Sequence, residues 1–176
     1  RGIVGAERVL GVMDEDFTLP NKGQIVKNHF DGKIEFQNVH FAYDEKQEVL
    51  KGISFKVNPG ETVAIVGATG AGKSTIISLI TRLYDINSGK ILLDDVDLKD
   101  YELYNLRSHI GVVLQDVFLF HGSIFENLSF GDETVTLEKI RSIAKEIEVD
   151  DFIMSLPGGY DYVVRERGSS ISLGQR

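Results

Sequence analysis

The feature that most constrains this sequence is a glycine-rich run that fits the phosphate-loop template of glycine, four residues, glycine, lysine and serine or threonine. The run comprises Gly67, Ala68, Thr69, Gly70, Ala71, Gly72, Lys73, Ser74 and Thr75. Glycines allow successive backbone N–H groups to turn inward around phosphate oxygens, and the positive end of a following helix adds to that attraction. We therefore expect Lys73 to reach the β- and γ-phosphates of a nucleotide and Ser74 to reach a magnesium ion.

The residues on either side of this loop support a nucleotide-binding interpretation. Residues 62–66 form a short apolar run that predicts a buried strand, and residues 74–83 carry apolar side chains at helical spacing. A strand, a phosphate loop and a helix thus follow one another in the order that the template requires. The alternative is a glycine-rich turn that binds no ligand.

Composition limits the partners that such a loop could serve. The chain has 176 residues, of which 42% are hydrophobic and 26% are charged, which is typical of a soluble globular domain with one core. Its formal net charge of −8 argues against a broad nucleic-acid surface, so phosphate binding is expected to be local. There is no cysteine, and the four histidines lack the spacing of metal ligands. No apolar run approaches the length of about 18 residues that a membrane span needs.

The first part of the chain is expected to lie outside the nucleotide-binding domain. Apolar residues between Ile3 and Met13 suit a short helix, and Pro20, Asn21 and Gly23 then mark a linker. The helix could belong to this domain or could be the tail of a preceding element. Because the chain begins with Arg1 rather than Met, it resembles a piece of a longer protein.

Apolar periodicity and turn residues predict the remaining elements. Strands are expected at residues 34–41, 53–57, 90–94 and 110–114, and helices at residues 101–107, 123–128, 137–148 and 151–155. Two antiparallel-looking strands ahead of the phosphate loop, followed by a strand, loop, helix and strand, indicate a mixed sheet. No internal repeat is visible.

Four features together resemble the nucleotide-binding domain of ABC transporters. They are the phosphate loop, Tyr43 upstream of it, Gln115 downstream, and residues 171–175 at the end of the chain. The resemblance implies an α/β phosphate-loop NTPase fold with a mixed sheet core, an antiparallel β-subdomain and a helical subdomain. It also implies that residues 1–32 are a linker that follows a membrane domain, and that residues 33–176 are the N-terminal part of an ABC-type ATP-binding domain.

The resemblance assigns roles to residues outside the loop. Tyr43 is similar to the family's aromatic residue that stacks on adenine, although a tyrosine in the core at a strand end is the alternative. Gln115 is similar to the glutamine that meets magnesium and the attacking water, although alone it would be read as a solvated loop residue. The terminal residues Ser172, Gly174 and Gln175 belong to a run that resembles the family signature, which faces the nucleotide of a partner domain. In that run Ile171 and Leu173 replace the commonest leucine and glycine.

A second apolar segment suggests a protein partner. Phe118, Phe120, Ile124 and Phe125 follow Gln115, and their position resembles the surface on which coupling helices of the membrane domain dock. Packing in the core is the alternative for these side chains.

Asp94 and Asp95 imitate another family motif, because they follow the apolar run 91–93 as the magnesium-binding carboxylates follow a strand in ABC proteins. In the family that strand comes after the signature, whereas this one precedes Gln115. We therefore expect Asp94 and Asp95 to form a turn.

The function implied by the resemblance is ATP binding and hydrolysis, with Mg²⁺, that power export across a membrane through head-to-tail dimerisation of two such domains at its cytoplasmic face. Lys73 and Gln115 are the expected catalytic residues. No Asp-Glu strand follows the signature in this sequence, so we expect a polypeptide of only these residues to lack ATPase activity. The alternatives are a regulatory, non-hydrolysing ABC domain of an asymmetric transporter and a non-transport phosphate-loop ATPase. A GTP-binding switch is disfavoured because no Asp-x-x-Gly or Asn-Lys-x-Asp follows Lys73.

Overall fold

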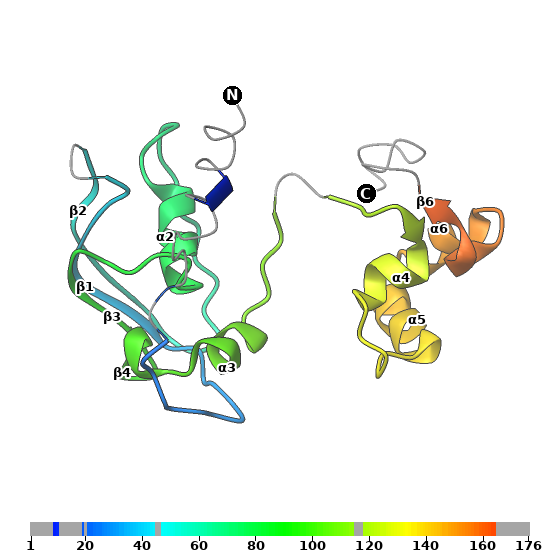
Figure 1. Ribbon diagram of the computed structural model, residues 1–176, viewed down its shortest axis with the longest axis horizontal. Coiled ribbons are helices and arrows are strands. Elements are labelled where there is room, and N and C mark those ends of the chain that lie inside the picture. The colour runs from blue at the N-terminus through cyan, green and yellow to red at the C-terminus, as the bar shows by residue number, and fades with distance from the viewer. Residues whose placement is uncertain (1–8, 11–18, 20, 45–46, 115–117, 165–176) are drawn as a thin grey trace. The chain divides into compact units, whose positions relative to one another are not determined.

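The computed structural model describes residues 9–10, 19, 21–44, 47–114 and 118–164 (Figure 1). The chain divides into two units, residues 1–112 and residues 113–176. Among the helices of the described residues, none is long and apolar enough to cross a membrane.

The first unit is built on a four-stranded antiparallel sheet in the order β2-β1-β3-β4 (Figure 1). Its strands are β1 (Ile34–Ala42), β2 (Glu48–Val57), β3 (Ser88–Leu93) and β4 (Val96–Asp97). The register pairs Ile34 with Val57 on one side and with Leu93 on the other. These positions confirm the predicted strands at 34–41, 53–57 and 90–94, including the antiparallel pair ahead of the phosphate loop.

A register irregularity in β1 determines which side chains reach the core. Phe36 and Val39 are three positions apart, so a regular strand would point them to opposite faces. The register shifts between these two residues, and Asn38 adopts a left-handed backbone with φ of 46°. Both side chains are consequently buried, as is Phe41 two positions further on.

The core of this unit lies between the sheet and the helix that follows the phosphate loop. Helix α2 (Lys73–Ile80) contributes Ile76 and Leu79 (Figure 1). The short helices η1 (Leu98–Asp100) and α3 (Leu103–Ser108) complete the unit. The buried core residues are Phe36, Val39, Phe41, Leu50, Ile76, Leu79, Ile91, Leu93, Leu98, Tyr101 and Leu106. The predicted helices at 74–83 and 101–107 are confirmed, each with a shift at its ends.

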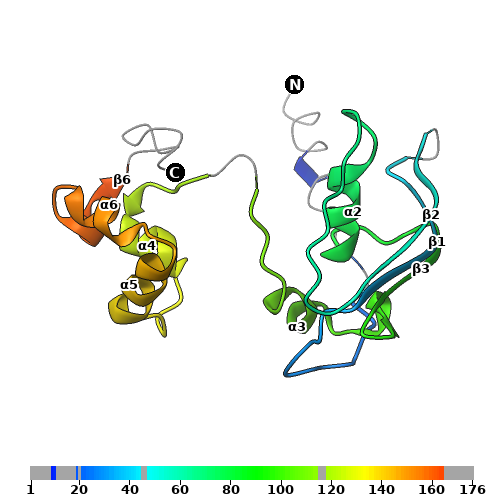
Figure 2. The same cartoon turned by 180° about the vertical axis from the view of Figure 1, so that it is seen from behind.

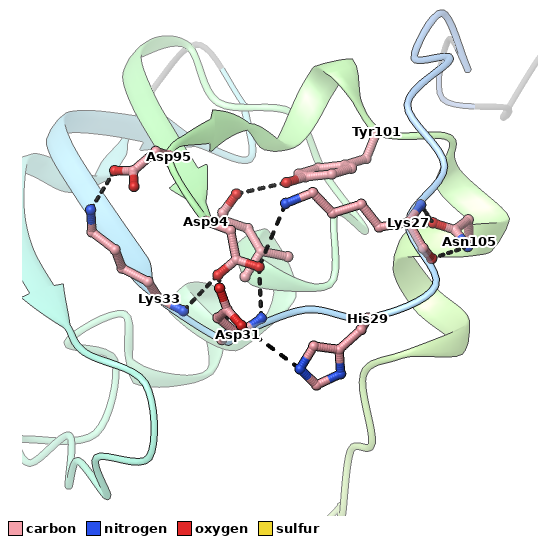
Figure 3. Close-up of polar contacts among 10 residues, drawn as sticks. Lys27, His29, Asp31, Lys33, Asp94, Asp95, Tyr101 and Asn105 are labelled. Atoms are coloured by element: carbon pink, nitrogen blue, oxygen red, sulfur yellow. Dashed lines mark hydrogen bonds and ion pairs between the residues drawn. The ribbon is translucent and has the colours of Figure 1, made fainter.

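Asp94 and Asp95 form the turn between β3 and β4, as predicted (Figure 3). Their φ angles of 51° and 67° are left-handed, which is the backbone of a tight hairpin turn. The Asp94 carboxylate is nearly buried, with 7% of the side chain exposed, and lies 3.8 Å from the Lys27 ammonium. It accepts backbone N–H groups from three consecutive residues, Asp31, Gly32 and Lys33, at 2.9, 3.0 and 2.9 Å. The carboxylate is therefore used in fixing the chain ahead of β1.

Residues 21–32, which belong to the predicted linker, contact the rest of this unit. Ile25 forms an isolated parallel bridge with Tyr101. The side chain of Asn105 holds both backbone groups of Lys27, accepting its N–H at 2.9 Å and donating to its carbonyl at 3.0 Å (Figure 3). Gly23 passes so close to Tyr101 that a Cβ atom would lie 2.0 Å from its carbonyl oxygen, so only glycine fits there.

Two predicted strands, residues 62–66 and residues 110–114, are wrong. Both runs are irregular, and Val66 and Val113 are 87% and 97% exposed. A strand is stabilised by hydrogen bonds to its neighbours, and within the described residues no strand pairs with either run. An apolar run alone therefore did not produce a strand.

The second unit is mainly helical (Figure 2). Its elements are β5 (Gly122–Ser123), α4 (Ile124–Ser129), α5 (Leu137–Glu146), α6 (Asp150–Ser155), η2 (Gly159–Asp161) and β6 (Val163–Val164), with β5 and β6 paired antiparallel. A capping box begins α4, in which Ser123 accepts the Glu126 N–H and the Glu126 carboxylate accepts the Ser123 N–H. The three predicted helices of this region are confirmed.

A buried acidic group organises the core of the second unit. The Asp150 carboxylate accepts two hydrogen bonds from the Arg141 guanidinium at 3.2 Å and one from the Tyr160 hydroxyl at 2.7 Å. The Arg141 hydrogen bonds, with that from Tyr160, lower the pKa of Asp150 below its usual value. Burial, with the hydrogen bond to Asp150, raises the pKa of Tyr160 to about 12. The sequence analysis did not identify this triad.

Candidate functional site

The phosphate-loop run forms an exposed loop that leads into α2. Gly70 and Gly72 have φ angles of 82° and 89°, which side chains other than glycine rarely adopt. The N–H of Ala71 donates to the carbonyl of Ala68 at 3.2 Å, closing a turn. Residues 67–71 are exposed, so the backbone N–H groups of this turn other than that of Ala71 face no barrier to a ligand from solvent.

Gly72 fixes the loop against the sheet. It is buried, and a Cβ atom at this position would lie 2.8 Å from Leu50 Cδ2 and 3.3 Å from Val49 Cγ1 on β2. The second defining glycine of the template is thus required twice, by its left-handed backbone and by its close approach to β2. The start of α2 is positioned by the antiparallel sheet.

The Lys73 side chain reaches back across the loop. Its ammonium donates hydrogen bonds to the carbonyl oxygens of Gly67 and Ala68 at 2.9 and 2.8 Å. An ammonium has three donors, and carbonyl oxygens hold it where phosphate oxygens could replace them. This geometry fits the predicted role of Lys73, because the positive charge lies beside the turn that carries the accessible N–H groups.

The first turn of α2 has the properties of an anion site, and it carries an exposed hydroxyl of a type that suits a cation. No side chain caps the helix at Gly72, and its first turn carries no acidic residue, so the first N–H groups keep their positive character. Ser74 is exposed there, and its hydroxyl oxygen is a ligand type suited to Mg²⁺. Among the described residues no group of three or more His, Cys, Asp or Glu could hold a metal.

Tyr43 lies at this loop although it is far from it in sequence. Its hydroxyl is 3.0 Å from the Thr75 hydroxyl, and 53% of its surface is exposed. Its ring is approached nearly at right angles by Phe41 (4.8 Å between centroids, 83°) and by Tyr84 (5.0 Å, 86°). The structure thus brings Tyr43 to the phosphate loop, half-exposed rather than in the core. The sequence analysis did not identify Tyr84.

The other predicted site residues fall outside the described part of the chain. Gln115 and the signature residues Ser172, Gly174 and Gln175 are among them, and so are the residues of the predicted N-terminal helix other than 9 and 10. Their roles stay predictions.

The apolar segment after Gln115 divides into exposed and buried side chains. Phe118 and Phe120 are exposed and contact each other edge to face at 5.0 Å, whereas Ile124 is buried in the core of the second unit and Phe125 is half-buried against it. Phe130, which the sequence analysis missed, is exposed and lies 5.8 Å from Phe120. Burial supports the core interpretation for Ile124, and the exposed rings of Phe118 and Phe120 are compatible with the docking interpretation, which stays a prediction.

The side chain of Asn127 shapes this exposed surface. It accepts the N–H of Phe120 at 2.8 Å and donates to the carbonyls of Phe120 and Ser123 at 3.0 and 2.9 Å. The backbone of Phe120 is thus fixed to α4, while the Phe120 ring is exposed.

Comparison with known proteins identifies the family. The ABC transporter family model matches residues 50–176, which include the whole phosphate loop. The chain belongs to the ABC transporter family. This ABC chain is 42% identical over 176 residues to the ATP-dependent lipid A-core flippase of Saccharophagus degradans, covering 100% of the chain and 30% of that protein. It is 43% identical over 175 residues to the fatty acid ABC transporter ATP-binding/permease protein of Mycobacterium bovis, covering 99% of the chain and 28% of that protein.

A solved structure gives the same result for the fold of this ABC chain. The structure of a bacterial Atm1-family ABC exporter with ATP bound aligns with a TM-score of 0.85 and 38% identity, over 99% of this chain and 31% of that one. The predicted α/β phosphate-loop NTPase fold is thereby confirmed, and the similarity is to exporter-type ABC proteins. The chain spans about 30% of the length of the curated relatives that it matches.

Proposed function

We propose that this chain is the ATP-binding and ATP-hydrolysing domain of an exporter and acts at the cytoplasmic face of a membrane. The observation that carries the proposal is the Lys73 ammonium, held by the Gly67 and Ala68 carbonyls beside the accessible N–H groups of the loop. The family match and the exporter-type relatives support the same assignment.

Binding would use the groups that the loop presents. Lys73 would exchange its carbonyl partners for oxygens of the β- and γ-phosphates, and the N–H groups at the start of α2 would donate to the same triphosphate. Ser74 would hold Mg²⁺, which when bound neutralises phosphate charge. The exposed part of the Tyr43 ring would stack on the base, an interaction worth roughly 1–3 kcal/mol for nucleic-acid bases on aromatic rings.

Hydrolysis and coupling would need more than this loop. Gln115 would orient the attacking water, and Ser172, Gly174 and Gln175 would complete the nucleotide site of a second copy in a head-to-tail dimer. The names of relatives that join ATP-binding and permease functions support a membrane partner. The exposed rings of Phe118 and Phe120 are the contact that we propose for it. That a polypeptide of only these residues is inactive stays a prediction.

The test is a titration of the natural full-length protein with a fluorescent ATP analogue. Lys73→Ala should weaken binding on the order of 10- to 100-fold, since charge-assisted hydrogen bonds contribute about 1.5–3 kcal/mol. Lys90→Ala is the matched control, because Lys90 is an exposed lysine on β3 away from the loop, and it should leave affinity unchanged. Equal affinity of the Lys73→Ala variant and the unaltered protein would contradict the proposal.

Phosphate release separates the proposed function from its nearest alternative. If the full-length protein binds ATP through Lys73 and releases phosphate in a magnesium-dependent way, the hydrolysing assignment holds. Binding with no release above a Lys73→Ala background would instead support the regulatory, non-hydrolysing domain.

A further inference from the structure

Three aromatic rings surround the point where β1 meets the phosphate loop. Phe41 is buried at the end of β1, Tyr43 follows it two positions later, and Tyr84 comes from the segment after α2. The centroid distances are 4.8 Å for Phe41 and Tyr43, 5.0 Å for Tyr43 and Tyr84, and 5.8 Å for Phe41 and Tyr84. All three pairs thus lie within the range in which aromatic rings attract one another.

The hydrogen bond between Tyr43 and Thr75 cannot orient the Tyr43 ring by itself. The hydroxyl lies on the long axis of the ring, so a bond of 3.0 Å at that point leaves the ring free to turn about the axis. A ring that contacts Tyr43 nearly at right angles does fix its plane, and Phe41 and Tyr84 do so at 83° and 86°. Neither ring lies parallel to Tyr43, and half of Tyr43 stays exposed.

Tyr84 is suited to this task because the chain around it is firmly held. The Arg107 guanidinium donates to the carbonyls of Thr81 and Arg82 at 3.1 and 2.6 Å. The buried side chain of Arg82 is paired with Asp85 at 3.0 Å. Tyr84 thus lies in a segment fixed by polar contacts at the end of α2, the helix whose first turn belongs to the phosphate loop.

We propose that Tyr84 is a positioning residue for base recognition, which keeps the plane of the Tyr43 ring ready to stack on the base of a bound nucleotide. The inference rests on the proposed function, in which Tyr43 stacks on the base. Tyr84 is expected to act on the base only, because its aromatic contacts are with Phe41 and Tyr43, whereas the loop groups that receive phosphate are oriented by Gly72 and Lys73. Loss of the Tyr84 ring should therefore weaken the binding of ligands that carry a base and leave the binding of phosphate-only ligands unchanged.

The experiment measures the affinity of the natural full-length protein for ATP and for inorganic tripolyphosphate by calorimetry. Tyr84→Ala and Tyr84→Leu should each lower the affinity for ATP about two- to tenfold, which is the range expected for one aromatic pair. Both should leave the affinity for tripolyphosphate unchanged. Tyr84→Phe keeps the ring and should restore ATP affinity. The leucine variant retains apolar volume, so it keeps the test valid if alanine disturbs folding. Tyr104→Ala is the matched control, since Tyr104 is an exposed tyrosine of the same unit, and it should change neither affinity.

A double-mutant cycle with Tyr43 decides whether Tyr84 acts through that ring. In a Tyr43→Ala background, Tyr84→Leu should cause no further loss of ATP affinity, because the ring that it orients is absent. The inference would be overturned if Tyr84→Leu lowered the affinities for ATP and tripolyphosphate equally. It would also be overturned if Tyr84→Leu caused its full loss of ATP affinity in the Tyr43→Ala background. If Tyr43→Ala weakens ATP but Tyr84→Leu does not, only this inference fails. If Tyr43→Ala itself leaves ATP affinity unchanged, the proposed base stacking fails first.

Discussion

The antiparallel sheet and the two apolar runs at 62–66 and 110–114 all contain residues typical of strands, but only the sheet forms strands. Strands β1, β2 and β3 bury Phe36, Leu50 and Ile91, whereas Val66 and Val113 lie exposed on irregular chain. Both regions are rich in β-branched or aromatic residues that favour strands. Their difference therefore does not arise from intrinsic strand propensity.

The source of the difference is where each strand finds its partner. A short loop joins β1 to β2, and the Asp94–Asp95 turn joins β3 to β4, so nearby residues supply the neighbours in two of the three strand pairs. The third pair, β1 with β3, forms beside these two hairpins. A parallel strand needs a neighbour brought by a crossover of a dozen or more residues. Local sequence thus specifies the two hairpins of the antiparallel sheet, whereas the two runs would need distant partners.

The largest expected effect comes from substitutions that compare the two regions directly. Phe36→Ala should cost about 3–5 kcal/mol, because Phe36 is 1% exposed and its ring stacks on Phe55 at 4.5 Å. Val66→Thr replaces a side chain by one of the same shape, and at an exposed site it should change stability by less than about 0.5 kcal/mol. Urea unfolding of this chain measures both. A cost above about 1 kcal/mol for Val66→Thr would show that the run is packed and would break the comparison.

The next effect concerns the junction between the sheet and the loop. Gly72→Ala should cost about 2–3 kcal/mol, since a Cβ atom would strain a left-handed backbone and press on Leu50. Gly70→Ala has the same backbone strain but no atom within 4 Å of the added Cβ, so it should cost about 1 kcal/mol. Thermal unfolding of the two variants tests the contact with β2. Equal destabilisation would mean that β2 does not constrain the loop.

The smallest expected effect comes from a substitution in the second unit, whose core contains the polar triad of Asp150, Arg141 and Tyr160. Tyr160→Phe removes the hydrogen bond to Asp150 and should cost about 1.5 kcal/mol. The folded-state pKa of Tyr160 is about 12, above the ordinary value, so its contribution is complete below about pH 10 and is lost as pH rises from about 10 through 12. Amide exchange of α5 and α6 between pH 8 and 11 should show an alkaline loss of stability that the Phe variant lacks. Identical pH profiles for the two proteins would contradict the role of Tyr160.

At acid pH the contribution of the same triad to stability depends on pH in the opposite direction. The pKa of Asp150 is lowered by Arg141 and Tyr160, so its contribution is present above the unfolded value and is lost as pH falls through the folded one. The first unit's sheet core consists of apolar residues apart from the Tyr101 hydroxyl, which donates to the Leu93 carbonyl. Burial raises the pKa of Tyr101 as well, so the first unit should also lose stability at alkaline pH.

The features that could be predicted from the sequence are those that depend on local information, and the features that were missed depend on distant residues. Helix α2, the strands of the antiparallel sheet and the Asp94–Asp95 turn were predicted because their periodicity or order lies within a few residues. Tyr43 was predicted from the family resemblance, and the structure places it at Thr75. Tyr84 was missed because one tyrosine after a helix carries no pattern. The Asp150 triad was missed because Arg141 and Tyr160 are nine and ten residues away, on other elements.

The central claim is that nucleotide binds at the phosphate loop, and amide hydrogen exchange with and without ATP and Mg²⁺ tests it most directly. In the natural full-length protein, ATP should slow exchange at the N–H groups of residues 70–75. It should leave unchanged the N–H groups of Asp31, Gly32 and Lys33, which donate to the Asp94 carboxylate. Lys73→Ala should abolish the protection at the loop. Protection at residues 31–33 with none at residues 70–75 would contradict the account and place the ligand at the acidic turn.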